Sequence, residues 1–190
     1  MNARFLLNML LGAAYLTMTV VTDAVAATTG DETRASNHPN HLEGHAAWCG
    51  LHVARQEFDQ AIEDCDEVLQ RDQGNADAYL NRGLAHLMKA QIGRAEEDLD
   101  AALRLKPGDA VLHYNRASLH FQKGEYRKAV DQYTETIRLA PGNPFAYNNR
   151  GIAFERLGDR HSAIADYRRA LQLDPALPTA RRNLLRLGVE

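Results

Sequence analysis

Four alanines recur along this chain at a constant 34-residue interval: Ala61, Ala95, Ala129 and Ala163 follow one another with no insertion between them. A fixed interval of this length is typical of proteins built from structural repeats that pack on their neighbours. An alanine at one place in every unit indicates that two helix backbones approach closely there, since a larger side chain would hold them apart. The period predicts four units, at residues 42–75, 76–109, 110–143 and 144–177.

Each unit is expected to form a pair of helices. It holds two amphipathic stretches of about 14 residues, with apolar residues at helical spacing. Gly124 and Gly158 lie where the chain should turn between the helices of a unit, and Pro107, Pro141 and Pro175 should end the second helices. No stretch has the alternating pattern of a strand. The fold class expected from these residues is all-α.

The units resemble the tetratricopeptide repeat, whose first helix carries W-x2-L-G-x2-Y and whose second carries A-x3-F before a proline. The fourth unit has these residues in register: Tyr147, Gly151, Phe154, Ala163, Tyr167, Ala170 and Pro175. The third matches with His113, Ala117, His120, Ala129, Tyr133 and Pro141. The first departs most, because Cys49, Cys65 and Gln73 stand where a small residue, an aromatic residue and proline are usual. The resemblance implies a superhelical solenoid of four helical hairpins.

A last amphipathic stretch follows the fourth unit, at residues 178–187. Leu184, Leu185 and Leu187 gather on one side of it, and three arginines are available for solvent. An open-ended array of repeats needs a terminal element with a polar outer face. This stretch is therefore expected to be a capping helix that completes a repeat domain at residues 42–190.

The first 26 residues have the pattern of a bacterial secretory signal peptide. Arg4 supplies a positive start, residues 5–21 are mostly apolar, and Ala24-Val25-Ala26 offers small residues that a signal peptidase accepts. We expect cleavage after Ala26, with Ala27 as the second choice, and a flexible polar lead-in at residues 27–41. An uncleaved anchor in the inner membrane is the alternative, for which the apolar run is at the short limit. Either interpretation exports the repeat domain to the periplasm or beyond, and cleavage would leave no stable membrane insertion.

Cys49 and Cys65 are the only cysteines of the chain. An even number of cysteines in an exported protein favours a disulfide bridge. They fall on the first and the second helix of the first unit, at positions that point toward the seam between the two helices. We expect a bridge there, and the alternative is a reduced pair that serves as small core residues.

Apolar residues on the first helices of the units are the strongest functional signal, because they lie where the core of a hairpin does not require them. In the tetratricopeptide family this face lines a concave groove that accepts peptides or helices of other proteins. The candidate groove residues are Leu80, Leu84, Leu87, Met88, Val111, Tyr114, Phe121, Phe145, Asn148 and Ile152. The alternative is that these side chains pack against neighbouring first helices. Family members that grip the carboxylate tail of chaperones place lysine, asparagine and arginine on this face. Asn148 is the only comparable group here, which favours an apolar peptide or an amphipathic helix as the ligand.

The net charge of −3 conceals a gradient along the chain. The first unit has eight acidic and two basic residues, whereas three arginines and one glutamate follow Pro178. Opposite ends of this kind could order a partner along the array or join copies of the chain head to tail, and an ordinary solvated surface is the alternative. The basic excess of a nucleic-acid-binding protein is missing.

Two sets of polar residues keep the 34-residue period. The arginines are Arg82, Arg116 and Arg150, and the aspartates are Asp64, Asp98 and Asp166. The arginines could form a track for anions, but ion pairs with the aspartates that hold the repeats together are the interpretation we favour.

The sequence contains no motif for catalysis: G-x-S-x-G, a phosphate-binding glycine loop and H-E-x-x-H are all absent. Ser118 and His120 are two residues apart, which directs them to different sides of a helix. His86 and His120 share one position of the repeat and are expected in the core. His38, His41 and His45 form H-x2-H-x3-H, a weak candidate for a metal site because no cysteine or fixed carboxylate accompanies it. We expect no cofactor and no metal.

These observations predict a non-catalytic interaction module, an adaptor or scaffold that binds another protein or peptide in the groove. A scaffold that assembles with itself through its charged ends is the first alternative, and an accessory subunit of an envelope enzyme is the second. A homo-oligomer is compatible with each of them.

Overall fold

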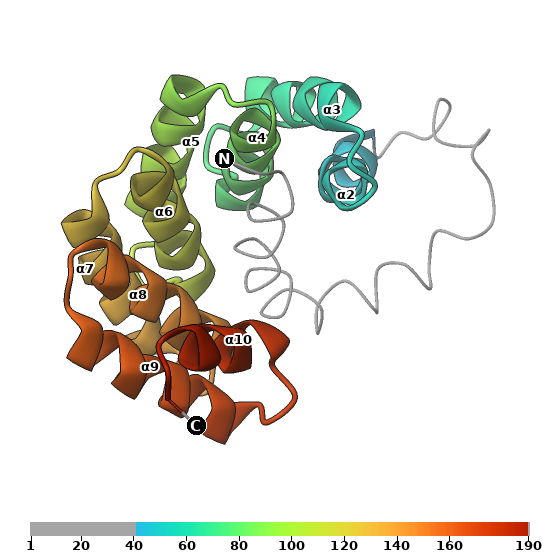
Figure 1. Cartoon of the computed structure of the whole chain (residues 1–190). Coiled ribbons are helices and arrows are strands. Elements are labelled where there is room, and N and C mark those ends of the chain that lie inside the picture. The colour runs from blue at the N-terminus through green and yellow to red at the C-terminus, as the bar shows by residue number, and fades with distance from the viewer. Residues whose placement is uncertain (1–40, 190) are drawn as a thin grey trace. The chain divides into compact units, whose positions relative to one another are not determined.

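The computed structural model describes residues 41–189, with side chains from His45 onward. Within this range every regular element is a helix (Figure 1). The helices are α2 (His41–Ala54), α3 (Phe58–Arg71), α4 (Ala76–Met88), α5 (Ile92–Leu105), α6 (Ala110–Gln122), α7 (Tyr126–Leu139), α8 (Pro144–Arg156), α9 (Arg160–Leu173) and α10 (Pro178–Arg186). The predicted all-α class is confirmed. The signal peptide, the membrane anchor and nearly all of the lead-in lie outside the described residues.

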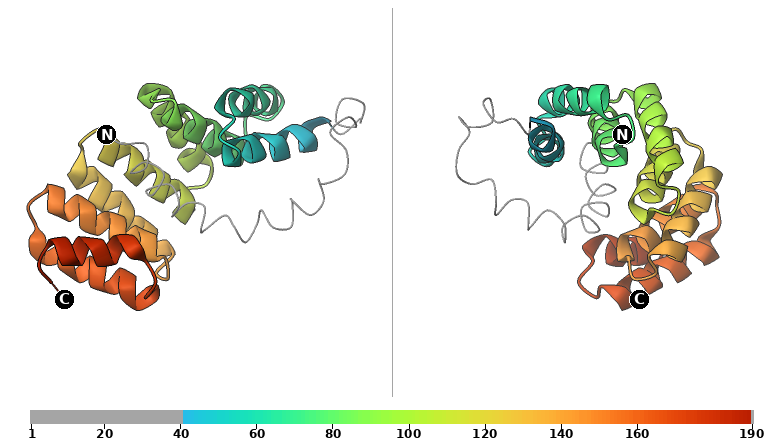
Figure 2. Two further views of the ribbon diagram at one scale, coloured as in Figure 1. Left: turned by 45° about the vertical axis from the view of Figure 1, so that its right-hand side comes forward. Right: turned by 180° about the vertical axis from the view of Figure 1, so that it is seen from behind.

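The described helices belong to two compact units, residues 41–107 and 108–189. In the first unit α2 pairs with α3 and α4 pairs with α5, while α4 also packs on α3 and on α2. In the second unit α6 pairs with α7 and α8 with α9, α8 packs on α7, and α10 packs on α9 (Figure 2). None of the described helices is both long enough and apolar enough to cross a membrane.

Capping residues fix where three of the first helices begin. Asn75, Asp109 and Asn143 again keep the 34-residue period. Their side-chain oxygens accept hydrogen bonds from backbone N–H groups of the first turn, at 2.9 Å from Ala78, 2.8 Å from Val111 and 3.0 Å from Phe145. Such caps satisfy donors that a helix leaves unpaired at its start.

The recurring alanines mark the closest approach of paired helices. Ala61, Ala95, Ala129 and Ala163 are all fully buried. Across the α8–α9 pair, a Cβ atom at Gly151 would lie 3.2 Å from the carbonyl oxygen of Ala163 and 2.7 Å from the ring of Tyr167. Small residues therefore face one another on the two helices, as the period predicted.

The capping helix α10 occupies the place of a fifth first helix. Leu184 packs with Ala163 and Tyr167 of α9, and Ala180 packs with Ala170. Asn183 follows Asn149 by one repeat period and so continues the asparagine series that starts at Asn81. The repeat pattern thus extends through α10 without a second helix.

The turns inside the hairpins require a left-handed backbone at one position. Gly124 and Gly158 have φ values of 77° and 83°. The same position of the two earlier turns holds Gln56 at 63° and Ala90 at 58°. A side chain in this conformation costs roughly 1–2 kcal/mol, which glycine avoids.

We therefore expect Ala90→Gly to raise the free energy of unfolding by about 1 kcal/mol, after allowance for the greater entropy of glycine in the unfolded chain. Urea denaturation at neutral pH measures this change. Gly124→Ala is the matched control and should lower the free energy by a similar amount. Destabilisation by Ala90→Gly would show that the left-handed turn is not strained.

Candidate protein-binding face

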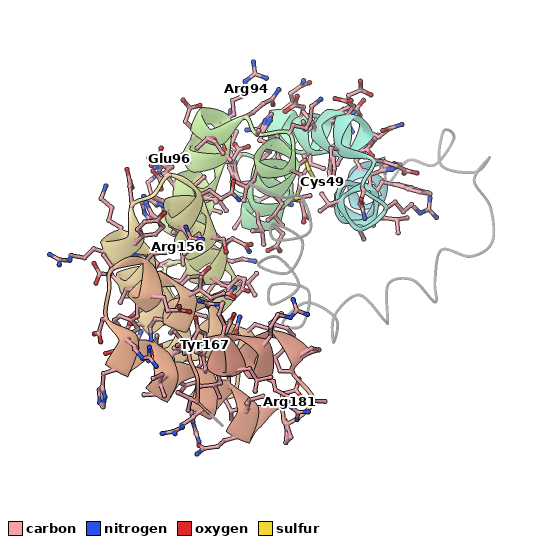
Figure 3. The ribbon with its side chains drawn as sticks, viewed as in Figure 1. Cys49, Arg94, Glu96, Arg156, Tyr167 and Arg181 are labelled. Atoms are coloured by element: carbon pink, nitrogen blue, oxygen red, sulfur yellow. A yellow bond between two sulfur atoms is a disulfide. The ribbon has the colours of Figure 1, made fainter. Side chains whose placement is uncertain are left out.

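A disulfide joins the two helices of the first hairpin. Cys49 of α2 and Cys65 of α3 are bonded, their Cα atoms lie 5.2 Å apart, and both side chains are fully buried (Figure 3). The predicted bridge is present. For a sequence separation of 16, the loop-closure argument gives a stabilisation of about 3 kcal/mol, and the bond holds α2 in place beside α3.

Half of the predicted groove residues do not face solvent. Leu80, Leu87, Tyr114, Phe121 and Asn148 are between 0% and 7% exposed, so the expectation that they line an open groove is wrong.

The aromatic residues of this buried set belong to the core. The Tyr114 ring packs edge-on to Tyr133 at 5.5 Å between ring centroids, and the Phe121 ring packs on Tyr126 at 5.1 Å. The Tyr114 hydroxyl accepts a hydrogen bond of 2.6 Å from Asn149. Tyr114 and Phe121 lie on the first helix of their repeat, as their spacing predicted, but their side chains point into the core and fill the space between helices.

Asn148 is held by other amides. Its Nδ2 donates to the Asn149 side chain at 3.0 Å, and its Oδ1 accepts from Nδ2 of Asn183 at 3.2 Å. The contact with Asn183 ties α10 to α8. Asn148 therefore serves the packing of the cap, and its amide is already engaged on both sides.

Three of the remaining candidates lie on the second unit and are partly buried. Val111, Phe145 and Ile152 pack against the cluster around Tyr114 and Tyr133. Phe145 and Ile152 also contact the clusters beneath α10. For these residues the structure supports the alternative interpretation, packing against neighbouring helices, although part of each side chain stays accessible.

The last two candidates, Leu84 and Met88, lie one turn apart on α4 and are partly exposed. Helix α2 packs on α4. Gly50 and Ala54 of α2 precede Leu84 and Met88 by 34 residues, so they hold the same positions of the repeat. A Cβ atom at Gly50 would lie 3.4 Å from Nδ2 of Asn81, which brings the α2 backbone close to α4.

We call this surface the α2–α4 face. It consists of Ala46, Gly50 and Ala54 of α2 and Leu84 and Met88 of α4, and both alanines are exposed. The α2 residues were missed in the sequence because they are small, although the 34-residue period places them in line with Leu80, Leu84 and Met88.

Arginines join consecutive helices through carboxylates. Arg82 of α4 binds both oxygens of Asp98 on α5, at 2.6 and 3.0 Å, and Asp66 of α3 at 2.5 Å. Arg150 of α8 binds both oxygens of Asp166 at 2.8 Å. Two of the predicted ion pairs are thereby confirmed, and these guanidinium groups are occupied by structural partners.

The third expected aspartate behaves differently. Asp64 contacts His45 at 2.8 Å and His52 at 3.4 Å, both on α2, because Trp48 stands where the arginine of that repeat would be. In the third repeat Gln132 replaces the aspartate beside Arg116 and forms a hydrogen bond of 2.9 Å with His113. The pairing of Asp64 with an arginine was a wrong expectation.

A histidine closes the turn in three of the hairpins. Nδ1 of His52, His86 and His120 lies 2.5, 2.6 and 2.7 Å from a side-chain oxygen of the residue five positions later, which is Glu57, Gln91 or Glu125. These oxygens can only accept, so Nδ1 carries the hydrogen. The interpretation of His86 and His120 as core histidines is confirmed, since each is 5% exposed.

The residues considered for chemistry serve packing as well. Ser118 is buried, and its Oγ lies 3.1 Å from the hydroxyl of Tyr133 and donates to the carbonyl oxygen of Tyr114. His45 contacts Asp64 and Glu67 through its two ring nitrogens. Among the side chains that the structure describes, no cluster of three histidine, cysteine or acidic residues could hold a metal ion. The side chains of His38 and His41 lie outside that set.

Known proteins share both the sequence pattern and the fold. The model of the tetratricopeptide repeat family matches residues 51–110 and 114–178. A crystal structure of MamA is 28% identical, with a TM-score of 0.67, over 72% of this chain and 80% of that one. The first TPR domain of Spaghetti (RPAP3), solved with the HSP90 peptide SRMEEVD, is 25% identical, with a TM-score of 0.59, over 62% of this chain and 93% of that one. The TPR domain of Arabidopsis OM64 is 28% identical, with a TM-score of 0.58, over 60% of this chain and 93% of that one. None of the curated proteins compared with the sequence matches it.

The turn histidine of the third hairpin makes stability depend on pH. Burial lowers the pKa of His120 below its ordinary 6.5, and this effect exceeds the opposing hydrogen bond to Glu125. The hydrogen bonds from His120 and Lys128 lower the pKa of Glu125 to about 2. Folded His120 is therefore neutral where the unfolded side chain begins to bind a proton.

Stability from this group is present above pH 6.5 and is lost as the pH falls toward the lower folded pKa. His120→Phe, which introduces the residue found at the equivalent position 154, should reduce the loss of unfolding free energy between about pH 7.5 and 5.5. Urea melts at the two pH values measure it, in a range where Glu125 does not titrate. Replacement of the exposed His161 by Phe is the control, and an unchanged slope in His120→Phe would contradict the assignment.

Proposed function

This chain belongs to the tetratricopeptide repeat family, and from that membership we propose that it is an adaptor that binds an apolar peptide or an amphipathic helix on the α2–α4 face. Repeats of this family form protein-interaction modules. The observation that carries the proposal is the partial exposure of Leu84 and Met88 beside Gly50 and Ala54.

The composition of the face suits an apolar ligand. Glycine and alanine on α2 let a partner approach the backbone, while Leu84 and Met88 supply apolar surface one turn apart. A ligand helix with apolar residues at the same spacing could bury them together. Methionine also adapts its shape to different partners. Because the disulfide already fixes α2 against α3, little order has to be created on binding.

The charges around the face argue for the same class of ligand. Spaghetti (RPAP3) was solved with a peptide that contains three acidic residues. In this chain the cation nearest in sequence to Leu84 is Arg82, whose guanidinium is held by Asp98 and Asp66. Lys89, next to Met88, is likewise paired with Asp59, so an acidic tail would have to compete with carboxylates of this chain for both cations, whereas an apolar ligand needs neither.

The test uses a photo-crosslinking amino acid in place of Leu84, with the chain expressed in its native host. A partner should crosslink from position 84 and not from position 105, where Leu105 is exposed on α5 and serves as the control. The partner identified by mass spectrometry is then titrated against the purified protein. Leu84→Glu combined with Met88→Glu should weaken binding by tenfold or more, since a buried unpaired charge costs roughly 2 kcal/mol or more.

Two outcomes would overturn the proposal. Equal crosslinking from positions 84 and 105 would mean that contact at the α2–α4 face is unspecific. Undiminished binding by the folded double variant, checked by circular dichroism, would place the ligand elsewhere. Phe121 is unsuitable for this test because its burial makes a charge there disruptive to folding.

We also propose that the repeat domain is exported, because a buried disulfide in a small domain is characteristic of oxidising compartments. Protein isolated from the native host should have an intact mass that corresponds to a chain starting at Ala27 or Thr28. Cys49 and Cys65 should resist alkylation until a reducing agent is added. Recovery of the chain with Met1 in the membrane fraction would support the anchor, and free thiols would contradict export.

A further inference from the structure

The strongest concentration of negative charge lies on α3 and its flanks. Seven carboxylates and one arginine occur between Glu57 and Asp72. Asp59, Glu63 and Glu67 follow at intervals of four, share one exposed side of α3, and span about 12 Å along its axis. We call these three residues the α3 acidic stripe.

The repulsion within this stripe is only partly relieved inside the described part of the chain. Lys89 contacts Asp59, whose side chain is still 77% exposed, and His45 contacts Glu67, which is 50% exposed. Glu63, in the middle, has no cation beside it among the described residues. Like charges one helical turn apart repel each other, so a cationic ligand over Glu63 would stabilise the helix.

The opposite charge collects at the other end of the sequence. Six arginines and two aspartates occur between residues 160 and 187. Neither aspartate neutralises the surface, since Asp166 is buried against Arg150 and Asp174 accepts a hydrogen bond from the backbone of Ala176. Arg186 is paired with Glu155 of α8, so the positive charge that stays at the surface of the α9–α10 pair comes from the other five arginines.

Helix α10 combines this charge with exposed apolar area. Arg181, which Figure 3 labels, lies on one side of it together with Arg182 and Leu185, at helical spacing and all exposed, and we call these three residues the α10 face. Leu185 is 64% exposed, the largest value among the large apolar side chains that the structure describes. Arg181 donates to the carbonyl oxygen of Pro175, which leaves its charge without a carboxylate. In a complete hairpin a second helix would cover this side, but α10 has none.

We propose that copies of this protein bind head to tail, the α3 acidic stripe of one copy against the α10 face of the next. The two surfaces have opposite charge, and the α10 face, which spans about 6 Å along its helix, fits within the length of the stripe. Ile62, half-buried beside Glu63, offers apolar contact for Leu185. Every copy supplies both halves of the contact, so the complementary surface is present wherever the protein is. This contact does not use the α2–α4 face and is independent of the proposed function.

Such a contact joins two different surfaces, so it leaves one of each free on every dimer. Assembly then continues into chains instead of stopping at two copies. The attraction acts between exposed charges and must weaken as salt shortens the range of electrostatic forces.

Sedimentation velocity of the full exported chain tests the proposal. At about 20 mM salt the mean mass should rise with protein concentration, and at about 500 mM salt it should fall to that of the monomer. Charge reversal of the α10 face (Arg181→Glu with Arg182→Glu) or of the stripe (Glu63→Lys with Glu67→Lys) should give monomers at low salt. A mixture of the two variants should assemble again, because each now carries a surface that fits the other.

The matched control is Arg94→Glu with Arg104→Glu on α5, which changes the net charge by the same amount at two exposed positions and should leave assembly intact. Circular dichroism confirms that each variant is folded. The proposal is overturned if the unmodified protein is a monomer at low salt, if the mixture of the two charge-reversed variants stays monomeric, or if the control variant loses assembly. Loss of assembly in the Leu84→Glu and Met88→Glu variant would instead assign self-association to the α2–α4 face and would equally overturn it.

Discussion

The close approach of two helix backbones within each hairpin is the constraint on which the rest of the structure depends. Fully buried alanines on the second helices face glycine, alanine or cysteine on the first. At Gly151 the space is so small that even a Cβ atom would meet the carbonyl of Ala163. With the helices this close, neighbouring side chains at fixed positions also come within reach of one another, which is why polar residues can repeat with the same period.

Those polar residues connect the hairpins more specifically than apolar packing could. A guanidinium on a first helix reaches the second helix of its own repeat and that of the repeat before, as Arg82 does with Asp98 and Asp66. A hydrogen bond between His120 and Glu125 closes the turn of its hairpin. A hydrogen bond from Asn183 to Asn148 connects α10 to α8. Where the arginine of a repeat is replaced, the aspartate forms other contacts, as Asp64 does with His45 and His52. Burial of these groups makes good hydrogen-bond geometry obligatory, so they specify one arrangement.

The first hairpin is the least typical in sequence and the most reinforced in structure. Cys49 and Cys65 take the positions of a small and an aromatic residue, and a covalent bond replaces the packing that they would have provided. This hairpin supplies the small-residue half of the α2–α4 face and the acidic stripe of α3. Both proposed binding surfaces thus draw on the element that the disulfide holds rigid, and a rigid surface loses less entropy on binding.

The sequence by itself determined the number of repeats and two of the ion pairs, because each follows from the 34-residue interval, and it favoured the disulfide, because both cysteines fall at the seam of one hairpin. It could not decide which apolar side chains remain at the surface. Helical spacing places Tyr114, Phe121 and Leu84 on the first helices alike, but their exposure depends on what the neighbouring helices bring against them. The ring of Tyr133 and the amide of Asn149 enclose Tyr114, whereas the small residues of α2 leave Leu84 partly open. That difference is one of volume in three dimensions, which only the tertiary structure contains.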